Sequence, residues 1–256
     1  MIRRPNLLLA AVALPAVVAT VIVLAPDGAS DRVARTTAGT GIGSAATAPA
    51  RSDATMSALF IGDSYTKSSR LVELSYACRA AVQMRWACDV SAVPGTGYVS
   101  GGAANRFPLA GEPGSSTSIP ERIPTLAMEY TPDVVVLDGG RNDLFPPAED
   151  VGKSMASALG EARRHWPDAT LVFLRPRYLV NPSDDLGFDD EFMARLKADP
   201  AAAGVVFLDP IADSFAGTDT SALLGPDGRH PNALGEQRLA DALVTALRRG
   251  GIGASS

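Results

Sequence analysis

The sequence predicts a single α/β domain in which helices cover both faces of a parallel sheet. Short apolar runs alternate with helical patterns, as is typical of this fold class. About 195 residues follow the amino-terminal segment, enough for one core but not for two comfortable domains. No internal repeat is evident. We therefore expect one domain over residues 57–250.

Each predicted element follows from its local pattern. Apolar runs predict five strands, near residues 57–61, 87–92, 133–138, 170–175 and 204–208. Helical patterns predict five helices, near residues 68–84, 119–129, 148–165, 187–198 and 232–248. The last helix carries a stripe of leucines, and Arg248 and Arg249 suit its carboxyl end. Ligands of such a sheet bind beyond the carboxyl ends of the strands.

A serine lies directly after the first predicted strand, in Gly62-Asp63-Ser64. A serine hydroxyl becomes a nucleophile when an imidazole takes its proton and a carboxylate orients that imidazole. The chain has only two histidines, His165 and His230, and His230 alone has an aspartate three residues before it on a Gly/Pro-flanked loop, Asp227. The sequence therefore predicts that Ser64, Asp227 and His230 are catalytic, whereas His165 is expected to be a surface residue at a helix end.

An ester hydrolase also needs hydrogen-bond donors where negative charge develops on the carbonyl oxygen. Asn142 follows the apolar run 134–137, so its side-chain amide is expected at the carboxyl end of that strand.

With these motifs the chain resembles the SGNH (GDSL-type) hydrolases, a family named for Ser, Gly, Asn and His in four sequence blocks. Gly62-Asp63-Ser64 matches the first block, Gly140-x-Asn142-Asp143 the third and Asp227-x-x-His230 the last. The second block is weaker, with Gly95 favoured over Gly97. The resemblance extends over roughly residues 57–249.

This resemblance implies an α/β/α sandwich of the flavodoxin-like kind with a five-stranded parallel sheet. It also implies a nucleophile at Ser64, a base at His230 oriented by Asp227, and oxyanion donors from Ser64 N–H, Gly95 N–H and the Asn142 amide. Each motif alone has an ordinary explanation as a helix cap, turn or loop. Their occurrence together, in the required order, carries the inference.

A different serine-hydrolase architecture can be excluded from the sequence. The nucleophile elbow of α/β-hydrolases requires Gly-x-Ser-x-Gly, and Thr66 stands two residues after Ser64.

The amino-terminal segment indicates export. Arg3 and Arg4 precede the mostly apolar residues 7–25, a stretch long enough to span a bilayer. Poor cleavage signals favour an uncleaved anchor at residues 1–25, with a cleaved signal peptide and secretion as the alternative. Residues 26–56 are rich in Ala, Gly, Thr and Ser and are expected to form a flexible linker. Both alternatives place the domain outside the cytoplasm.

The two cysteines, Cys78 and Cys88, fit an oxidising compartment. We expect a disulfide between them, with two buried free thiols as the alternative. No cofactor is expected, and the cysteines and histidines match no metal-ligand spacing.

Because the net charge is −5 and the sequence has no basic run, we do not expect the protein to bind nucleic acid. Arg141, Arg175 and Arg177 lie at strand ends, where they either meet an anionic or sugar substrate or pair with surface carboxylates. Tyr98 and Phe145 are candidate walls of an acyl pocket, or ordinary packing residues.

Together these features predict an exported serine esterase that acts on esters of carbohydrate, lipid or cell-envelope molecules. An acyltransferase would use the same residues, and an envelope-binding domain without turnover would keep the same fold. The sequence leaves the oligomeric state and the acyl-chain length open.

Overall fold

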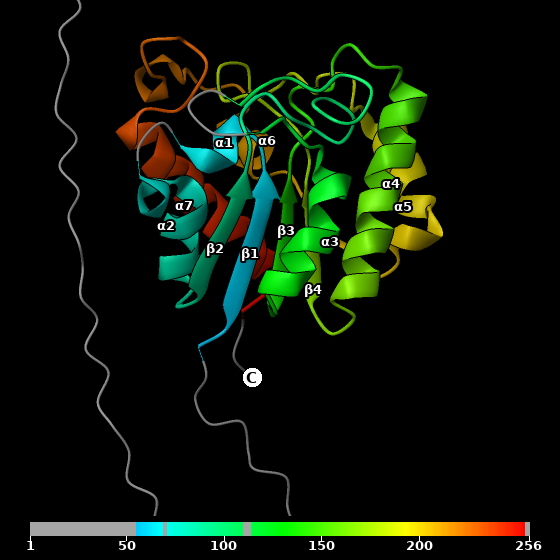
Figure 1. The fold of residues 1–256 in the computed structure, drawn as a ribbon. Helices are drawn as coiled ribbons and strands as arrows, with labels where there is room; N and C mark the ends of the chain where they lie inside the picture. Colours follow the sequence, from blue (N-terminus) through cyan, green and yellow to red (C-terminus); the bar gives the residue numbers. More distant parts are fainter. Residues whose placement is uncertain (1–54, 69–70, 110–113, 254–256) are drawn as a thin grey trace, which may run out of the picture. The chain divides into compact units, whose positions relative to one another are not determined.

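The structure, a computed structural model, describes residues 55–68, 71–109 and 114–253. At its centre is a five-stranded parallel sheet with the strand order β2-β1-β3-β4-β5 (Figure 1). The strands are β1 (Ser57–Gly62), β2 (Ala87–Ala92), β3 (Val134–Asp138), β4 (Thr170–Leu174) and β5 (Val206–Leu208). The predicted α/β fold with five parallel strands is confirmed.

Successive side chains of the central strands point to opposite faces of the sheet, so each strand contributes side chains to two hydrophobic cores. In β1, Phe60 packs in one core and Leu59 and Ile61 pack in the other, and all three are fully buried. Burial on both faces explains why β1 and β3 are continuous apolar runs without alternating polar residues.

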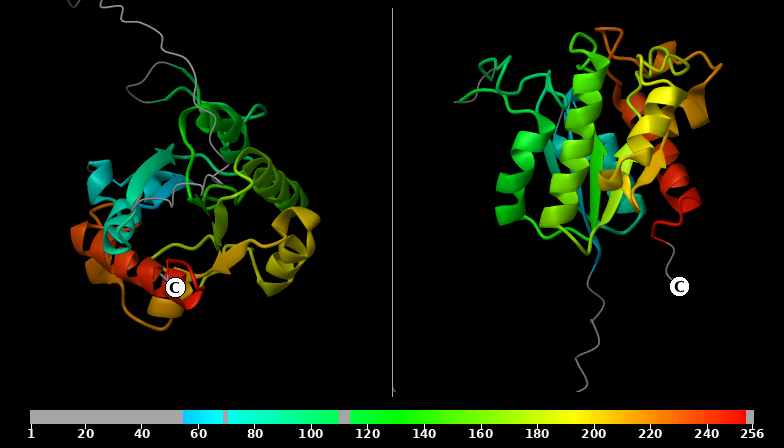
Figure 2. Two further views of the ribbon diagram at one scale, coloured as in Figure 1. Left: turned by 90° about the horizontal axis from the view of Figure 1, so that it is seen from below. Right: turned by 90° about the vertical axis from the view of Figure 1, so that its right-hand side faces the viewer.

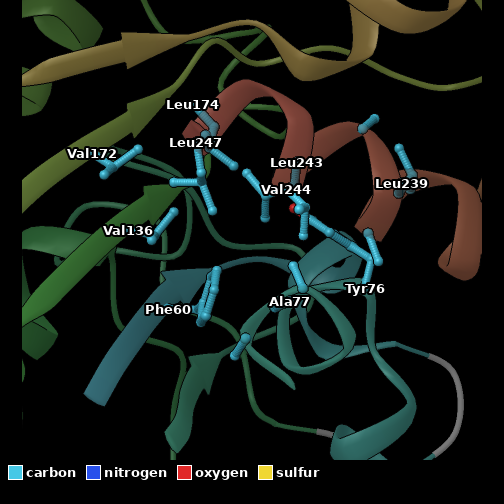
Figure 3. Packing of buried hydrophobic residues seen from close by; sticks show 14 of the residues in the cluster. Phe60, Tyr76, Ala77, Val136, Val172, Leu174, Leu239, Leu243, Val244 and Leu247 are labelled. Atoms are coloured by element: carbon cyan, nitrogen blue, oxygen red, sulfur yellow. The ribbon is translucent and has the colours of Figure 1, made fainter. Parts of the chain in front are cut away.

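Helices cover both faces. The α-helices are α1 (Ser64–Lys67), α2 (Tyr76–Gln83), α3 (Ile119–Glu129), α4 (Ala148–His165), α5 (Asp190–Ala198), α6 (Pro210–Phe215) and α7 (Ala233–Arg249). The 3₁₀ turns are η1 (Val72–Leu74), η2 (Pro200–Ala202) and η3 (Ser221–Leu223). Helices α2, α6 and α7 pack on the Phe60 face, where Leu243 and Leu247 of α7 reach the sheet (Figure 3). Helices α3, α4 and α5 pack on the other face, and Figure 2 shows α4 in green and α7 in red on opposite sides of the sheet.

The first predicted helix, 68–84, is wrong as one continuous element. Within this range the chain forms η1 and then α2, because Ser75 is an N-cap whose side chain accepts a hydrogen bond from the Cys78 N–H and starts a new helix. Helix α6 was not predicted, because six residues are too few for a helical period to show. The other predicted helices and all the strands lie within three residues of their observed bounds.

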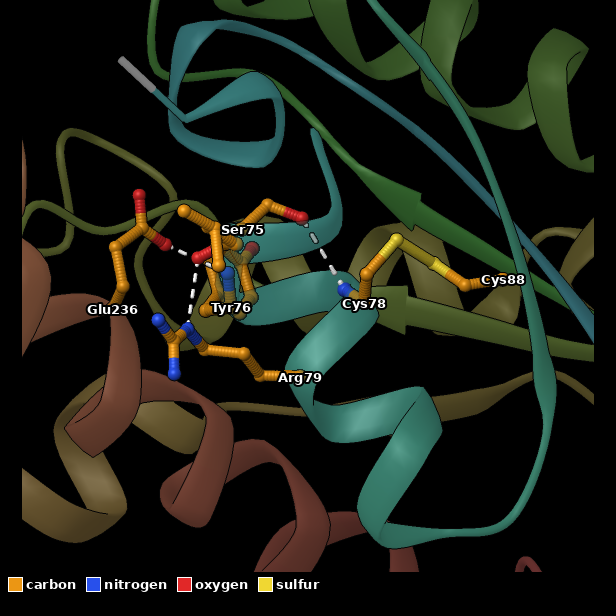
Figure 4. The surroundings of a disulfide bond; sticks show 7 residues. Ser75, Tyr76, Cys78, Arg79, Cys88 and Glu236 are labelled. Carbon is orange, nitrogen blue, oxygen red and sulfur yellow. Dashed lines mark hydrogen bonds between the residues drawn. A yellow bond between two sulfur atoms is a disulfide. The ribbon is translucent and has the colours of Figure 1, made fainter. Parts of the chain in front are cut away.

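Cys78 of α2 and Cys88 of β2 form a disulfide, as predicted (Figure 4). The bond joins residues ten apart in the sequence and ties α2 to the edge strand of the sheet. Closing a loop of this length stabilises the fold by about 2–3 kcal/mol in the chain-entropy view.

The predicted anchor, residues 1–25, and nearly all of the predicted linker, residues 26–56, lie outside the described residues. Among the helices of the part that the structure describes, none is sufficiently long and apolar to cross a membrane.

Candidate active site

The predicted site residues lie together at the carboxyl ends of the strands, at the top of Figure 1. Ser64 follows β1, Gly95 follows β2 and Asn142 follows β3. The loop that contains Asp227 and His230 precedes α7. Because β1 lies between β2 and β3 in the sheet, Ser64 has the Gly95 loop on one side and the Asn142 loop on the other.

Ser64 is held at a sharp turn from strand to helix. It is the first residue of α1, and the Asp63 side chain caps this helix by accepting a 2.9 Å hydrogen bond from the Tyr65 N–H. A Cβ atom at Gly62 would lie 1.9 Å from Thr66 Oγ1, so the turn has no room for a side chain there. The Ser64 N–H stands in the first turn of the helix, where no carbonyl one turn earlier can bind it.

Ser64, His230 and Asp227 form a continuous chain of hydrogen bonds. Ser64 Oγ lies 2.8 Å from Nε2 of His230, and Nδ1 of the same ring lies 2.6 Å from Oδ2 of Asp227. Hydrogen bonds from the His230 side chain and from the Arg229 and His230 N–H groups hold the pKa of Asp227 well below its usual range. Asp227 is therefore a carboxylate that keeps the proton on Nδ1 and leaves Nε2 to accept the serine proton.

The other histidine is remote from this chain of bonds. His165 ends α4, and its Nε2 lies 3.6 Å from Glu161 Oε2, one helical turn earlier. The structure therefore brings His230, and not His165, to Ser64.

The geometry favours Gly95 over Gly97 as the backbone donor. Among the described residues, Gly95 N–H has no hydrogen-bond partner, and the residue is exposed with a φ of +77°. In contrast, Gly97 N–H donates to the Ser100 carbonyl at 3.0 Å. A Cβ atom at Gly97 would also lie 2.2 Å from the Asp143 carboxylate, so close packing explains why this position is a glycine.

Sequence reasoning missed the role of Asp143, although the residue belongs to the third motif. Its buried carboxylate accepts hydrogen bonds from three successive backbone N–H groups, those of Tyr98 (2.6 Å), Val99 (3.1 Å) and Ser100 (2.8 Å). Asp143 thus fixes the loop after β2 against the loop after β3, and these loops contain Gly95 and Asn142.

Arg141 pairs with carboxylates, as in the second of the two alternatives left open by the sequence, but these carboxylates are buried and not at the surface. It is 2% exposed, and its guanidinium lies 2.9 Å from Asp138 Oδ1 and 3.5 Å from Asp63 Oδ1. Arg175 and Arg177 likewise bind Asp190 at 2.8 Å and Asp209 at 2.7 Å. All three arginines are therefore engaged within the fold.

Asp63, Asp138 and Arg141 form a cluster beneath Ser64. Of its two carboxyl groups, Asp138 has the stronger hydrogen-bond donors. Thr66 Oγ1 donates to Asp138 at 2.6 Å and the Tyr76 hydroxyl also donates to it, in addition to Arg141. Burial, partly offset by Arg141, raises the pKa of Asp63 to about 6.

The two aromatic residues predicted as candidate acyl-pocket walls do not line a pocket by Ser64. Tyr98 is 1% exposed and stacks on Phe173, with 5.8 Å between the ring centroids, and Phe145 is 96% exposed. The pocket beside Gly95 is lined instead by Phe107, Pro108 and Leu109. They belong to the loop 99–117, in which the sequence has no recognisable motif.

No group of His, Cys, Asp or Glu that could hold a metal ion occurs within residues 55–68, 71–109 and 114–253. The arrangement of Ser64, His230 and Asp227 can perform acyl transfer with side chains alone.

Comparisons with known proteins agree with this geometry. A sequence model described as the GDSL-like Lipase/Acylhydrolase family matches residues 60–238. A GDSL lipase of Mycobacterium tuberculosis, Rv0518, is 32% identical over 199 residues, which are 73% of this chain and 79% of that protein.

Solved structures share the fold at low identity. An active-site mutant of a family two carbohydrate esterase from Clostridium thermocellum matches 76% of this chain with 20% identity and a TM-score of 0.58, and the chain spans only 63% of that structure. The psychrotrophic esterase EstA from Pseudoalteromonas sp., solved with monoethylphosphonate as inhibitor, matches 75% of this chain and 97% of its own with 17% identity and a TM-score of 0.55. At such identities the likeness indicates the fold alone.

Proposed function

The chain belongs to the GDSL-like lipase/acylhydrolase (SGNH) family, whose members are esterases and lipases, and on that premise we propose that it hydrolyses carboxylic esters through an acyl-enzyme on Ser64. The single observation that carries the proposal is the 2.8 Å contact between Ser64 Oγ and His230 Nε2. This distance allows direct proton transfer between the two atoms.

The proposed reaction has two symmetric halves. His230 Nε2 takes the Ser64 proton while Oγ attacks the ester carbonyl carbon, and the C=O π electrons move to the oxygen. The tetrahedral intermediate then collapses, the bond to the alcohol oxygen breaks, and the alcohol leaves with the proton from His230. A water molecule repeats these steps on the acyl-enzyme and releases the carboxylic acid.

Three donors would stabilise the negative charge on the carbonyl oxygen: Ser64 N–H, Gly95 N–H and the Asn142 amide. The proposal for Gly95 is supported by its exposure and its unpaired N–H. Donors that are fixed before the reaction lower the barrier because they need no reorganisation as the charge develops.

We also propose that the domain works outside the cytoplasm, tethered by residues 1–25, on esters of carbohydrate, lipid or envelope molecules. The arginines Arg3 and Arg4 before an apolar stretch support this location. The disulfide supports it too, because such bonds persist in oxidising compartments. The native protein should fractionate with membranes and keep its amino terminus. A mature chain that began near residue 30 and was free in the medium would replace the anchor by a cleaved signal.

A fluorophosphonate probe tests the proposed nucleophile, and phosphonate chemistry is suitable because it mimics the tetrahedral intermediate. The full chain should be labelled on Ser64, and Ser64→Ala should abolish both labelling and turnover of p-nitrophenyl acetate. The matched control Ser221→Ala changes an exposed serine of η3 and should label like the wild type. Labelling of folded Ser64→Ala at the wild-type rate would contradict the proposal.

Product analysis separates hydrolysis from acyl transfer. With an added sugar acceptor, the proposed esterase should release free acid, whereas an acyltransferase would give mainly acylated sugar.

A further inference from the structure

A pocket of about 400 Å³ adjoins the proposed oxyanion donor, and nothing in the mechanism above uses it. Gly95 forms one of its edges, and Lys67, at the end of the helix that Ser64 begins, forms another. The remaining lining residues are mostly apolar: Ala92, Val93, Pro94, Phe107, Pro108 and Leu109.

Phe107 is the residue that ties this pocket to the reaction centre. Its ring lies 3.1 Å from the position that a Cβ atom would occupy at Gly95. The ring is only partly buried, so one part packs on Gly95 and another part remains open to the pocket. A group bound against Phe107 therefore lies next to the backbone that would stabilise the oxyanion.

The wall that carries Phe107 is fixed by hydrogen bonds. Phe107 N–H donates to Ser116 Oγ at 2.9 Å, and Ser116 N–H donates to the Phe107 carbonyl at 2.8 Å. Arg106 binds the Ser116 carbonyl and pairs with Glu121 of α3 at 2.7 Å. The pocket is thus a preformed feature, as is usual for small-molecule sites.

The position of the pocket indicates which half of an ester it would receive. The leaving alcohol must reach His230, because the imidazole returns the proton to the alcohol oxygen. None of the described residues that line the pocket belongs to the loop 225–231, which carries Asp227 and His230. They come from α1, from the end of β2 and from the segments that follow it, on the Gly95 side of Ser64. This is the acyl side of the substrate.

We propose that this pocket binds the acyl chain and that the enzyme prefers apolar acyl chains of medium length over acetyl groups. The inference rests on the proposed function, since it concerns the substrate of the same site. A methyl group would leave most of a 400 Å³ pocket unfilled. Each methylene that enters it contributes up to about 0.8 kcal/mol, which corresponds to a rise in kcat/KM of about fourfold.

The test compares two substrate series on the full chain. In p-nitrophenyl esters from acetyl to dodecanoyl, kcat/KM should rise with acyl length up to a maximum near hexanoyl or octanoyl. In acetate esters of alcohols of increasing length, kcat/KM should change much less. If the enzyme hydrolyses acetate esters but its kcat/KM stays constant or falls as the acyl chain lengthens, the inference is overturned and the proposed function remains intact. Failure to turn over or label with any ester or phosphonate would contradict the proposed function itself.

Variants of Phe107 test whether the dependence of kcat/KM on acyl-chain length arises in this pocket. Phe107→Trp should narrow the pocket and lower the octanoyl-to-acetyl ratio of kcat/KM by about tenfold, the loss of nearly two buried methylenes. Phe107→Ala should move the maximum to longer chains. Leu109→Trp provides a second obstruction if a tryptophan at position 107 prevents folding. The matched control Phe145→Ala removes an exposed phenyl group outside the pocket and should leave the chain-length profile unchanged. The proposal fails if both tryptophan variants keep the wild-type ratio, or if Phe145→Ala shifts the profile as Phe107→Ala does.

Discussion

The side-chain amide of Asn142 donates a hydrogen bond of 2.9 Å to the carbonyl oxygen of Thr96. This bond joins the loop after β3 to the loop after β2 and fixes which way the amide group faces. Because an amide NH₂ group has two donors, the second N–H remains for a substrate oxygen. The same asparagine therefore joins the Gly95 loop to the loop after β3 and, in the proposed mechanism, supplies a donor beside Gly95.

The first prediction follows from this double role. Asn142→Ala should lower kcat by about 10²–10³-fold with a much smaller change in KM, because the donor acts mainly in the transition state. Slow labelling of Ser64 by a fluorophosphonate should survive, since the nucleophile and base remain. Steady-state kinetics on a variant checked by circular dichroism would decide. A folded Asn142→Ala enzyme with the wild-type kcat would reduce Asn142 to an ordinary turn residue.

The second prediction concerns the base. His230→Ala should lower kcat/KM by about 10³-fold or more, because Ser64 loses the group that takes its proton. His165→Ala is the matched control and should retain nearly full activity, because His165 ends α4 beside Glu161. If His165→Ala were the inactive variant, the assignment of Asp227 and His230 would be wrong.

The third prediction concerns Arg122, a residue of α3 that no sequence motif singles out. Its guanidinium is 7% exposed and donates to the carbonyl oxygens of Gly62 and Ser91, each at 2.9 Å. These carbonyls lie at the carboxyl ends of β1 and β2, just before the loops that carry Ser64 and Gly95. Burial lowers the pKa of Arg122 to about 10, so the guanidinium is charged at neutral pH.

Arg122→Met should lower the free energy of unfolding by about 2–4 kcal/mol, because the buried carbonyl of Gly62 and the half-buried carbonyl of Ser91 lose a charged donor. It should also lower kcat by up to about 10²-fold with little change in KM, because the two strand ends that carry the oxyanion donors lose their common support. Arg122→Lys should restore part of the stability and less of the kcat, since one ammonium lacks the fork that spans both carbonyls. A stability loss with unchanged kcat would make Arg122 a purely structural residue.

The fold was predictable because the central strands are buried on both faces and therefore read as uninterrupted apolar runs. The candidate site residues Ser64 and Asn142 were predictable because their motifs follow these strands, and Asp227 and His230 because their spacing matches a motif of the family. The acyl pocket was not, since its position depends on contacts distant in the sequence, such as the packing of Phe107 against Gly95. Tyr98 appeared equally suitable in the sequence, but the loop that Asp143 holds turns its ring into the core.

The fourth prediction tests the disulfide. Replacing both Cys78 and Cys88 by serine should lower the free energy of unfolding by about 2–3 kcal/mol, because the unfolded chain regains the freedom of a short loop. A reducing agent should shift the urea midpoint of the wild type but not that of the double variant. Activity at low temperature should persist, because Cys88 lies at the opposite end of β2 from Gly95. An identical midpoint for the two proteins would mean that the bond contributes nothing to stability.

The last prediction uses the buried carboxyl under the nucleophile. The pKa of Asp63 is raised from 3.8 to about 6, chiefly by burial, so the folded state binds this proton more tightly than the unfolded chain does. The wild type should therefore gain stability from Asp63 as the pH falls from about 6 towards 4, and lose it as the pH rises through about 6. Asp63→Asn can still cap α1 but cannot titrate. Relative to this variant, the wild type should gain about 1.4 kcal/mol per pH unit within that window. Urea unfolding of both proteins between pH 4 and 8 measures the difference. If the wild type instead lost stability relative to Asp63→Asn as the pH fell, the folded protein would lower the pKa of Asp63 and keep it as an ionised partner of Arg141.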